Sequence, residues 1–417
     1  MKRTWKSVLG AAVAAAALLA VSLAPTGAAA ADKVVKIGNL LPLSGPSASV
    51  GQQGKQAREM AVEEINAAGG IKSLGGAKLQ LIFADTKSDP NVGVSETERL
   101  INTDKVDVIT GAWNSSVTYP TTAVAERYKV PYLVPVSVRD TITERGFKYV
   151  FRVAAKDSWW TRDQFAFLKD MEKEFGVPLK TVAFVYENGD WGTGFAAQWK
   201  KLAEQSGMKV VLDEPYPSSS TDLTAVVMKI RRANPDVLLL TSNAADAILL
   251  TNTLADYKVH PKAIIGSGGG HADPTFISAT GKNCRYLFDI VEWETDVNKP
   301  GAAETNAKYK KLYGYNMTGE AVDAYASMYV LKDALERAAS LNPEKLRDAL
   351  ATTDLKTGPG MIVAYDSIQF DESGQNKNAA LSIVQINDLG KGLERITVWP
   401  KSARRAGYTP VFPMPSK

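Results

Sequence analysis

The 417-residue sequence has one cysteine, two histidines and almost no excess of charge of either sign. A single cysteine, Cys284, cannot form an internal disulfide, so the stability of the fold must come from burial of its core. With only His260 and His271, a cysteine–histidine zinc centre is excluded. The sequence also lacks a Gly-x-Ser-x-Gly motif and a Walker phosphate-binding motif. It therefore predicts no catalytic residues, no metal centre and no cofactor.

The small net charge of +4 comes mainly from the N-terminus, where three basic residues occur within the first six positions. An apolar, alanine-rich stretch from Val8 to Leu23 and a run of alanines, Ala28–Ala31, follow them. This pattern predicts a signal peptide over residues 1–31, and the alternative is an N-terminal anchor helix. The apolar stretch is short for a membrane span, and no later one reaches that length. Without the predicted signal peptide the net charge falls to +1, so we expect no nucleic-acid partner.

Short apolar strands alternate with amphipathic helices in two consecutive series. In the helix predicted from Gly51 to Ala68, for example, Ala57, Ala61 and Ile65 fall on one face. Such alternation indicates parallel sheets covered by helices on both faces. The predicted fold class is therefore α/β, with two lobes of similar size. The predicted strands are Val35–Leu41, Leu79–Phe83, Val106–Ile109, Tyr132–Val136 and Tyr149–Val153, then Thr181–Tyr186, Lys209–Leu212, Val237–Leu240 and Ala263–Ile265.

The segment from Pro300 to Ala351 breaks the alternation, because apolar residues recur in it at helical spacing almost throughout. Strand-like stretches follow around Ile368, at Ala380–Ile386 and at Ile396–Trp399. A helical insertion followed by late strands indicates that the chain returns to the first lobe and then crosses again to the second.

Small polar residues follow four predicted strands, at the point where each strand ends and a helix begins. In open α/β sheets, ligands bind outside these carboxyl ends. A Ser or Asn at a helix start can cap the exposed backbone N–H groups, and the same N–H groups can instead bind a carboxylate. Several such loops opening on one cleft favour a ligand site over simple capping. The loops contain Ser44–Ser47, Asn114 with Ser115 and Ser116, Ser137 with Arg139 and Asp140, and Ser242 with Asn243.

Tryptophans also occur in the predicted strand-end loops, at Trp113, Trp159-Trp160 and Trp191. Burial in the core or between lobes is one interpretation. The other is that their rings grip an apolar or ring-shaped ligand, with Trp113 and Trp191 as the preferred walls. Trp199 and Trp399 are predicted to be packing residues.

A glycine-rich string, Gly266-Ser267-Gly268-Gly269-Gly270, follows the last strand of the second series. It does not have the spacing of a dinucleotide-binding motif, and a flexible turn is favoured over a phosphate-binding loop. His271, beside it, is either an exposed loop residue or a ligand contact.

The order of several short strings along the chain carries a family resemblance. These strings are Ile37-Gly38, Pro42-Leu43-Ser44-Gly45, Gly51-Gln52, Glu64-Ile65-Asn66-Ala67-Ala68-Gly69-Gly70-Ile71, Asp85, Gly111, Ser115-Ser116, Thr143-Glu144-Arg145-Gly146, Phe151-Arg152, Tyr325-Ala326 and Asp333-Ala334. Together they resemble the periplasmic leucine/isoleucine/valine-binding proteins, the solute receptors of branched-chain amino acid ABC importers. The resemblance covers nearly all of the chain after the predicted signal peptide.

The resemblance implies the type I periplasmic binding fold, in which two Rossmann-like lobes joined by a three-segment hinge close on a small molecule. The first lobe would comprise residues 32–153 and 292–366, and the second residues 154–291 and 367–417. It also implies a monomer in the periplasm, whose partners are a small-molecule ligand and the membrane permease of an ABC importer.

The family's ligand-binding positions can be carried over residue by residue. Ser115 matches the serine that binds the ligand carboxylate through its hydroxyl and backbone, and Val136 matches a position that contributes backbone groups. Val138 falls where a threonine commonly contacts the amine, and Asn243 falls where a tyrosine is common. Gly268 stands where an acidic residue usually pairs with the ligand ammonium.

This sequence departs from the family at Gly268, at Val50, which replaces an aromatic residue, and at Asn114, which occupies one position of a disulfide found in some members. An ammonium removed from water needs a paired charge or full hydrogen bonding. Three other acids are candidates for that role: Asp157, Asp246 and Asp273. Otherwise the ligand carries no ammonium.

The residues and the resemblance predict a solute-binding protein that encloses a carboxylate-bearing ligand, such as a branched-chain or other amino acid, by hinge closure. The predicted ligand-binding residues are Trp113, Ser115, Ser116, Val136, Ser137, Val138, Asp157, Trp191, Asn243 and Gly268. A receptor of the same fold for an aromatic acid, an amide or urea remains an alternative, as does a ligand sensor. An exported enzyme is a further alternative, although no nucleophile–base pair supports it.

Overall fold

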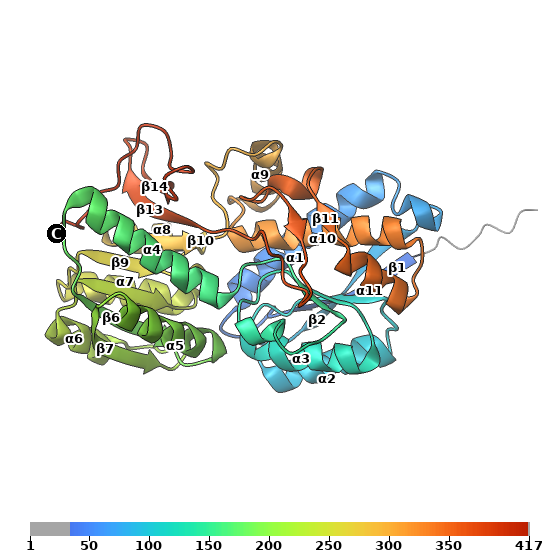
Figure 1. Ribbon diagram of the computed structural model, residues 1–417, viewed down its shortest axis with the longest axis horizontal. Helices are drawn as coiled ribbons and strands as arrows, with labels where there is room; N and C mark the ends of the chain where they lie inside the picture. Colours follow the sequence, from blue (N-terminus) through green and yellow to red (C-terminus); the bar gives the residue numbers. More distant parts are fainter. Residues whose placement is uncertain (1–33, 416–417) are drawn as a thin grey trace, which may run out of the picture.

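The computed structural model describes residues 34–415, so the predicted signal peptide lies outside the described residues. The predicted α/β fold is confirmed: the chain builds a five-stranded and a seven-stranded sheet, each with helices, and the two bodies lie side by side (Figure 1). We call the body with the five-stranded sheet the first lobe and the other the second lobe. No helix in the described part of the chain is long and apolar enough to cross a bilayer.

The first lobe begins with a parallel sheet in the order β2-β1-β3-β4-β5. The two short central strands are completely buried, as expected for a sheet covered on both faces. Its elements are β1 (Val34–Leu41), α1 (Ala48–Ala67), β2 (Lys78–Asp85), α2 (Pro90–Asn102), β3 (Val108–Thr110), α3 (Ser115–Tyr128), β4 (Tyr132–Val134) and β5 (Val150–Arg152), with single 3-10 turns at Lys72–Leu74 and Asp140–Ile142.

The second lobe has a sheet in the order β14-β13-β10-β9-β8-β6-β7. β6 to β10 are parallel, and the late strands β13 and β14 add antiparallel to one edge. Its elements are α4 (Asp157–Phe175), β6 (Thr181–Glu187), α5 (Asp190–Gln205), β7 (Lys209–Tyr216), α6 (Thr224–Ala233), β8 (Val237–Thr241), α7 (Ala244–Asp256), β9 (Ala263–Gly266), α8 (Phe276–Thr280), a 3-10 turn at Gly281–Cys284, β10 (Phe288–Val291), β13 (Ser382–Asp388) and β14 (Leu393–Trp399).

The helical stretch predicted from Pro300 to Ala351 consists of three helices. They are α9 (Ala302–Tyr313), α10 (Gly319–Ala338) and α11 (Pro343–Ala351), followed by a 3-10 turn at Pro359–Ile362 and the small antiparallel pair β11 (Asp354–Leu355) and β12 (Ile368–Gln369). Gly314 ends α9 in a left-handed conformation, and Pro343 starts α11 at a position where no N–H is needed. These helices share a core with α1, so they belong to the first lobe.

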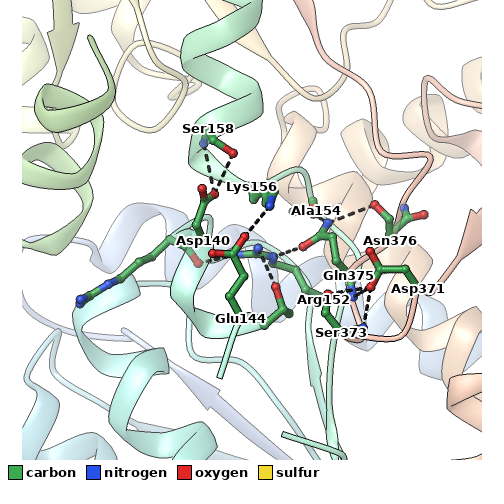
Figure 2. Close-up of polar contacts among 12 residues, drawn as sticks. Asp140, Glu144, Arg152, Ala154, Lys156, Ser158, Asp371, Ser373, Gln375 and Asn376 are labelled. Atoms are coloured by element: carbon green, nitrogen blue, oxygen red, sulfur yellow. Dashed lines mark hydrogen bonds and ion pairs between the residues drawn. The ribbon is translucent and has the colours of Figure 1, made fainter. Parts of the chain in front are cut away.

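Three segments connect the lobes. One joins β5 to α4, a second joins β10 to α9, and a third runs between Phe370, in the core of the first lobe, and Leu381, in the core of the second. The predicted lobe limits stay a prediction. The first and third segments are joined by polar contacts. The side-chain amide of Gln375 donates to the carbonyl oxygen of Ala154 at 2.8 Å (Figure 2), and that of Asn376 donates to the carbonyl oxygen of Val153 at 2.9 Å.

Candidate functional site

A cavity of about 240 Å³ lies between the two lobes and is lined by residues of both. Eight of the ten predicted ligand-binding residues line it: Trp113, Ser115, Ser116, Val136, Ser137, Val138, Trp191 and Asn243. The other two, Asp157 and Gly268, do not, although Ser267 and Gly269 on either side of Gly268 do. The loops at the carboxyl ends of the strands therefore converge on one space, as expected for an open α/β sheet.

Three helices point uncapped N-termini at this cavity. The N-cap residues Ser47 of α1, Asn114 of α3 and Asn243 of α7 all line it, and none of them makes a side-chain capping hydrogen bond. The simple capping interpretation is therefore wrong for these residues. Because the first N–H groups of a helix have no partner within the helix, these ends can donate to a bound anion.

The side chains of the same N-cap residues instead bind one another across the cavity. Asn114 Nδ2 donates to Ser47 Oγ at 2.8 Å, and Ser47 Oγ donates to Asn243 Oδ1 at 3.2 Å. Asn243 Nδ2 in turn donates to Ser218 Oγ at 2.7 Å. An ion pair between Arg139 and Asp190 joins the lobes at a second place. Direct polar contacts thus hold the lobes together beside the cavity.

Ser115 is the first residue of α3 and is almost fully buried, at 3% exposure. Its hydroxyl accepts a long hydrogen bond of 3.4 Å from the backbone N–H of Arg139. The neighbouring Ser137 hydroxyl is already engaged with Thr118 and with the carbonyl oxygen of Trp113. Of these two serines, Ser115 is therefore the one whose hydroxyl proton is available to a ligand.

Three indole rings line the cavity. Trp113, in the turn after β3, has a positive φ of 78°, which is uncommon for a residue with a side chain. Trp160 and Trp191 come from the first turns of α4 and α5. The prediction that they lie in loops is wrong, because α4 already begins at Asp157 and α5 at Asp190. Trp160 is an additional wall that sequence reasoning did not select.

The glycine-rich string does not form a phosphate-binding loop. The backbone N–H of Gly268 donates to Asp289 Oδ1 at 2.8 Å, and that of Gly269 donates to Glu320 Oε1 at 3.0 Å, so both donors are occupied by carboxylates. A methyl group on Gly269 would lie 2.7 Å from Cη2 of Trp191, and one on Gly268 would lie 3.2 Å from the ring of Trp160. The turn interpretation holds, and the lack of side chains allows both indoles to pack on it.

The acids that line the cavity are not those considered from the sequence. Asp157, Asp246 and Asp273 are absent from the lining, whereas Glu187, Glu292 and Glu320 are present, together with Asp190, which pairs with Arg139. Glu187 is satisfied structurally, because it accepts the N–H groups of Gly189 and Gly192 at 2.7 Å each. Glu292 directly follows β10. The argument that ligands bind at the carboxyl ends of strands, which selected Ser115, therefore also applies to Glu292. Glu320 lies in the first turn of α10, where no strand precedes it and the sequence gives no such signal.

Among the residues that the structure describes, no lysine, arginine or histidine lines the cavity. His271 is fully buried beside Phe276, away from the lining, and burial lowers the pKa of its imidazole to about 3. The described residues also contain no group of three or more His, Cys, Asp or Glu that could hold a metal ion. The charged side chains around the cavity are therefore mainly acidic.

Asp157 lies where α4 folds back on the first lobe, with its backbone N–H donating to the carbonyl oxygen of Val138 at 2.8 Å. Burial and the adjoining Asp140 carboxyl raise the pKa of Asp157 to about 8. The pKa of Asp140 is lowered instead, because Asp140 is hydrogen-bonded to Asp157 and Ser158 and lies near the positive charge of Lys156. The two carboxyls therefore share one proton at neutral pH. Asp157 has a structural role in this pair rather than a place in the cavity.

The Asp157 pair predicts a pH-dependent stability. The folded state keeps a proton that the unfolded chain releases near pH 4, so wild-type stability should fall as the pH rises towards about 8. Asp157→Asn keeps a donor for Asp140 without a charge, so it should be about 1–3 kcal/mol more stable than the wild type near pH 9. Thermal unfolding between about pH 5 and 9 measures this. An equal pH dependence of the two proteins would contradict the shared proton.

Comparisons with known proteins agree with this geometry. A periplasmic binding protein family model matches residues 34–391. The Leu/Ile/Val-binding protein homolog 7 of Brucella abortus (strain 2308) is 30% identical over 398 residues, which are 92% of this chain and 96% of the relative.

Two solved structures show the same fold. The branched-chain amino acid transporter substrate-binding protein LivJ from Streptococcus pneumoniae, in complex with isoleucine, has a TM-score of 0.76 at 23% identity and covers 88% of this chain and 100% of that chain. A solute-binding protein of an ABC transporter from Rhodopseudomonas palustris, in complex with 3,4-dihydroxybenzoic acid, has a TM-score of 0.76 at 20% identity and covers 88% of this chain and 96% of that chain. The fold predicted from the sequence is confirmed.

Proposed function

Because this chain belongs to the periplasmic leucine/isoleucine/valine-binding protein family, we propose that it is the solute receptor of an ABC importer. It binds a small carboxylate-bearing ligand, such as a branched-chain or other amino acid, and presents it to the membrane permease. The observation that carries the proposal is the uncapped N-terminus of α3, with Ser115, opening on the cavity between the lobes. Backbone N–H groups and a free hydroxyl at a helix N-terminus are the donors that a carboxylate requires.

Ligand binding is coupled to hinge closure. The first lobe supplies Trp113, Ser115 and the α3 N-terminus, whereas the second supplies Trp160, Trp191 and Asn243, so a ligand touches both only when the lobes are together. Contacts that exist in one conformation alone are what shift a population towards it. The cross-lobe hydrogen bond from Ser47 to Asn243 also belongs to that closed arrangement.

The remaining features of the proposal follow from the family and the sequence. The relatives are binding proteins, and this chain binds its ligand without chemical turnover. Residues 1–31 direct export to the periplasm, where the protein works as a monomer with no nucleic-acid partner. The limits of the lobes, 32–153 with 292–366 and 154–291 with 367–417, belong to the same proposal.

An aromatic acid is the second candidate ligand, followed by an amide or urea, and a ligand sensor is a related alternative. The three indole rings around the cavity favour a ring-shaped ligand, and Gly268 provides no acid for an ammonium. A thermal-shift screen of the protein from Asp32 onward against amino acids, aromatic acids, amides and urea separates these classes. An upward shift with any of these classes supports a receptor, whereas no shift with any class contradicts the proposal.

Ser115→Ala should weaken binding of the ligand found in that screen by about 1–3 kcal/mol, the usual loss for a hydrogen bond to a charged group. The backbone donors of α3 remain, so binding should not be abolished. Calorimetric titration measures the change. Ser95→Ala, which alters an exposed serine on α2, is the matched control and should leave the affinity unchanged. An unchanged affinity in Ser115→Ala would refute the role of Ser115.

A further inference from the structure

Two buried carboxylates from different segments meet at the cavity. Glu292 lies on the segment that leaves β10, and Glu320 lies in the first turn of α10. Each is only 4% exposed, yet both line the cavity. A methyl group on Gly319 would lie 2.6 Å from Glu292 Oε2, so the Glu292 carboxylate packs directly against the start of α10.

The hydrogen bonding of this pair is incomplete. Glu320 Oε1 accepts the backbone N–H of Gly269 at 3.0 Å. The backbone N–H of Glu292 itself acts on the Glu292 carboxylate. The indole N–H of Trp160, which lines the same cavity and is 3% exposed, has no hydrogen-bond partner in the described part of the chain. A buried carboxylate without hydrogen-bond partners is costly unless a donor from a ligand in the cavity reaches it, and the indole N–H of Trp160 is free for an acceptor such as the ligand carboxylate.

The charged groups around the pair are mainly acidic. Asp289 from β10, Asp323 from α10 and Asp273 after β9 are further acids that act on it, and Tyr365 also faces it. The nearby cation is Arg395 of β14, which acts on Asp289 and is hydrogen-bonded to the carbonyl oxygens of His271 and Asp273. Burial and repulsion from Glu320 and Asp323 raise the pKa of Glu292 well above its usual range. A cationic ligand would relieve this repulsion.

We propose that Glu292 and Glu320 bind a positively charged group of the ligand, a primary ammonium, in place of the acid that Gly268 does not supply. This inference rests on the proposed function and narrows it: the ligand is an amino acid with its carboxylate at the α3 N-terminus and its ammonium at these two glutamates. A metal ion does not fit, since the described residues provide no group of three ligands. An aromatic acid without an ammonium would place no cation beside the two glutamates.

The test pairs each L-amino acid with the carboxylic acid that lacks its amino group, for example L-leucine with 4-methylpentanoate and L-phenylalanine with 3-phenylpropanoate. Benzoate, acetamide and urea complete the panel. Calorimetric titration should show that the amino acid binds at least 10-fold more tightly than its deaminated partner, on the order expected for a lost charged hydrogen bond. Glu292→Gln should weaken amino-acid binding by about 10- to 100-fold and should therefore reduce the preference for the amino acid over its deaminated partner.

A pH series gives a second readout that a merely structural role would not change. Because burial and repulsion raise the pKa of Glu292, the wild type should bind the amino acid more tightly as the pH rises, and Glu292→Gln should show a flatter dependence. Glu304→Gln, an exposed change on α9, is the control for both measurements.

The outcomes separate this inference from the proposed function. If deaminated acids, benzoate, acetamide or urea bind as tightly as the amino acids, or if Glu292→Gln binds like the wild type, the cation site is wrong and the receptor role stands. If no compound of the panel or of the broader screen binds, the receptor role fails and the cation site fails with it.

Discussion

Replacing Arg152 with methionine is expected to lower the free energy of unfolding by about 3–5 kcal/mol. Arg152 ends β5 and is completely buried. Its guanidinium donates to Gln375 Oε1 at 2.6 Å (Figure 2). It also donates to the carbonyl oxygens of Ser137 and Arg139 at 3.1 and 2.7 Å and to Thr143 Oγ1 at 3.1 Å. Methionine fills a similar volume but leaves all four acceptors without that donor.

The expected loss is large because Arg152 joins two of the crossing segments. The backbone N–H of Arg152 donates to the carbonyl oxygen of Gly374, and its carbonyl oxygen accepts the backbone N–H of Asn376. Its side chain binds Gln375, which lies between these two residues in the third crossing segment. Burial lowers the pKa of its guanidinium to about 10, which still leaves it charged at neutral pH, and the acids Asp157, Asp140, Glu144 and Asp371 offset part of that shift. Removing the charge would also take away the buried guanidinium that acts on Asp157.

Chemical denaturation of matched variants measures this effect. Arg162→Met removes a guanidinium that is 58% exposed and pairs with Asp163, so it should change stability by less than about 1 kcal/mol. Arg152→Lys keeps the charge but not the forked geometry, so its loss should be intermediate. A stability of Arg152→Met within about 1 kcal/mol of the wild type would contradict the role of this network.

The sequence was sufficient to predict the fold class and most of the cavity wall. The alternation of strands and helices placed Asn114, Ser115 and Asn243 at strand ends, and parallel strands bring those ends to one edge. Trp199, which does not lie in a predicted strand-end loop, was predicted to be a packing residue, and it is completely buried. These predictions were correct because they depend on the local order of strands and helices, which the folded chain keeps.

What could not be predicted depends on how distant segments meet. Glu320 reaches the cavity only because α10 packs with α1 in the first lobe while its first turn contacts the Gly268–Gly269 turn of the second. Asp157 follows a strand end as Ser115 does, yet the first turn of α4 directs it to Asp140. The start of α5 at Asp190 was hidden by its two glycines, Gly192 and Gly194, because glycine is a poor helix former. No one-dimensional pattern distinguishes these cases.

Trp199→Ala is expected to cost about 3–5 kcal/mol of stability, in the range for deleting a buried aromatic side chain. Trp199 lies in the core of the second lobe, with ring centroids 5.4 Å from Phe184 and 5.6 Å from Phe195. Its indole N–H donates to Gln164 Oε1 at 2.7 Å, and Gln164 Nε2 donates to Ser267 Oγ, a cavity-lining group, at 2.9 Å. The substitution therefore removes both packing and a hydrogen bond.

The same residue should affect ligand binding without touching the ligand. Phe195 lies between Trp199 and the two wall tryptophans, with ring centroids 6.2 Å from Trp160 and 6.1 Å from Trp191.

Trp199→Phe restores most of the packing but leaves Gln164 Oε1 without its donor, so it should lose only about 1–3 kcal/mol of stability. Trp159→Ala, at a half-buried tryptophan of α4, is the control and should cost less than Trp199→Ala. If Trp199→Phe is as stable as the wild type, the Gln164 hydrogen bond does not stabilise the lobe. If folded Trp199→Ala binds its ligand with wild-type affinity, the wall tryptophans are positioned independently of this core, and the aromatic chain from Trp199 through Phe195 to the cavity has only a structural role.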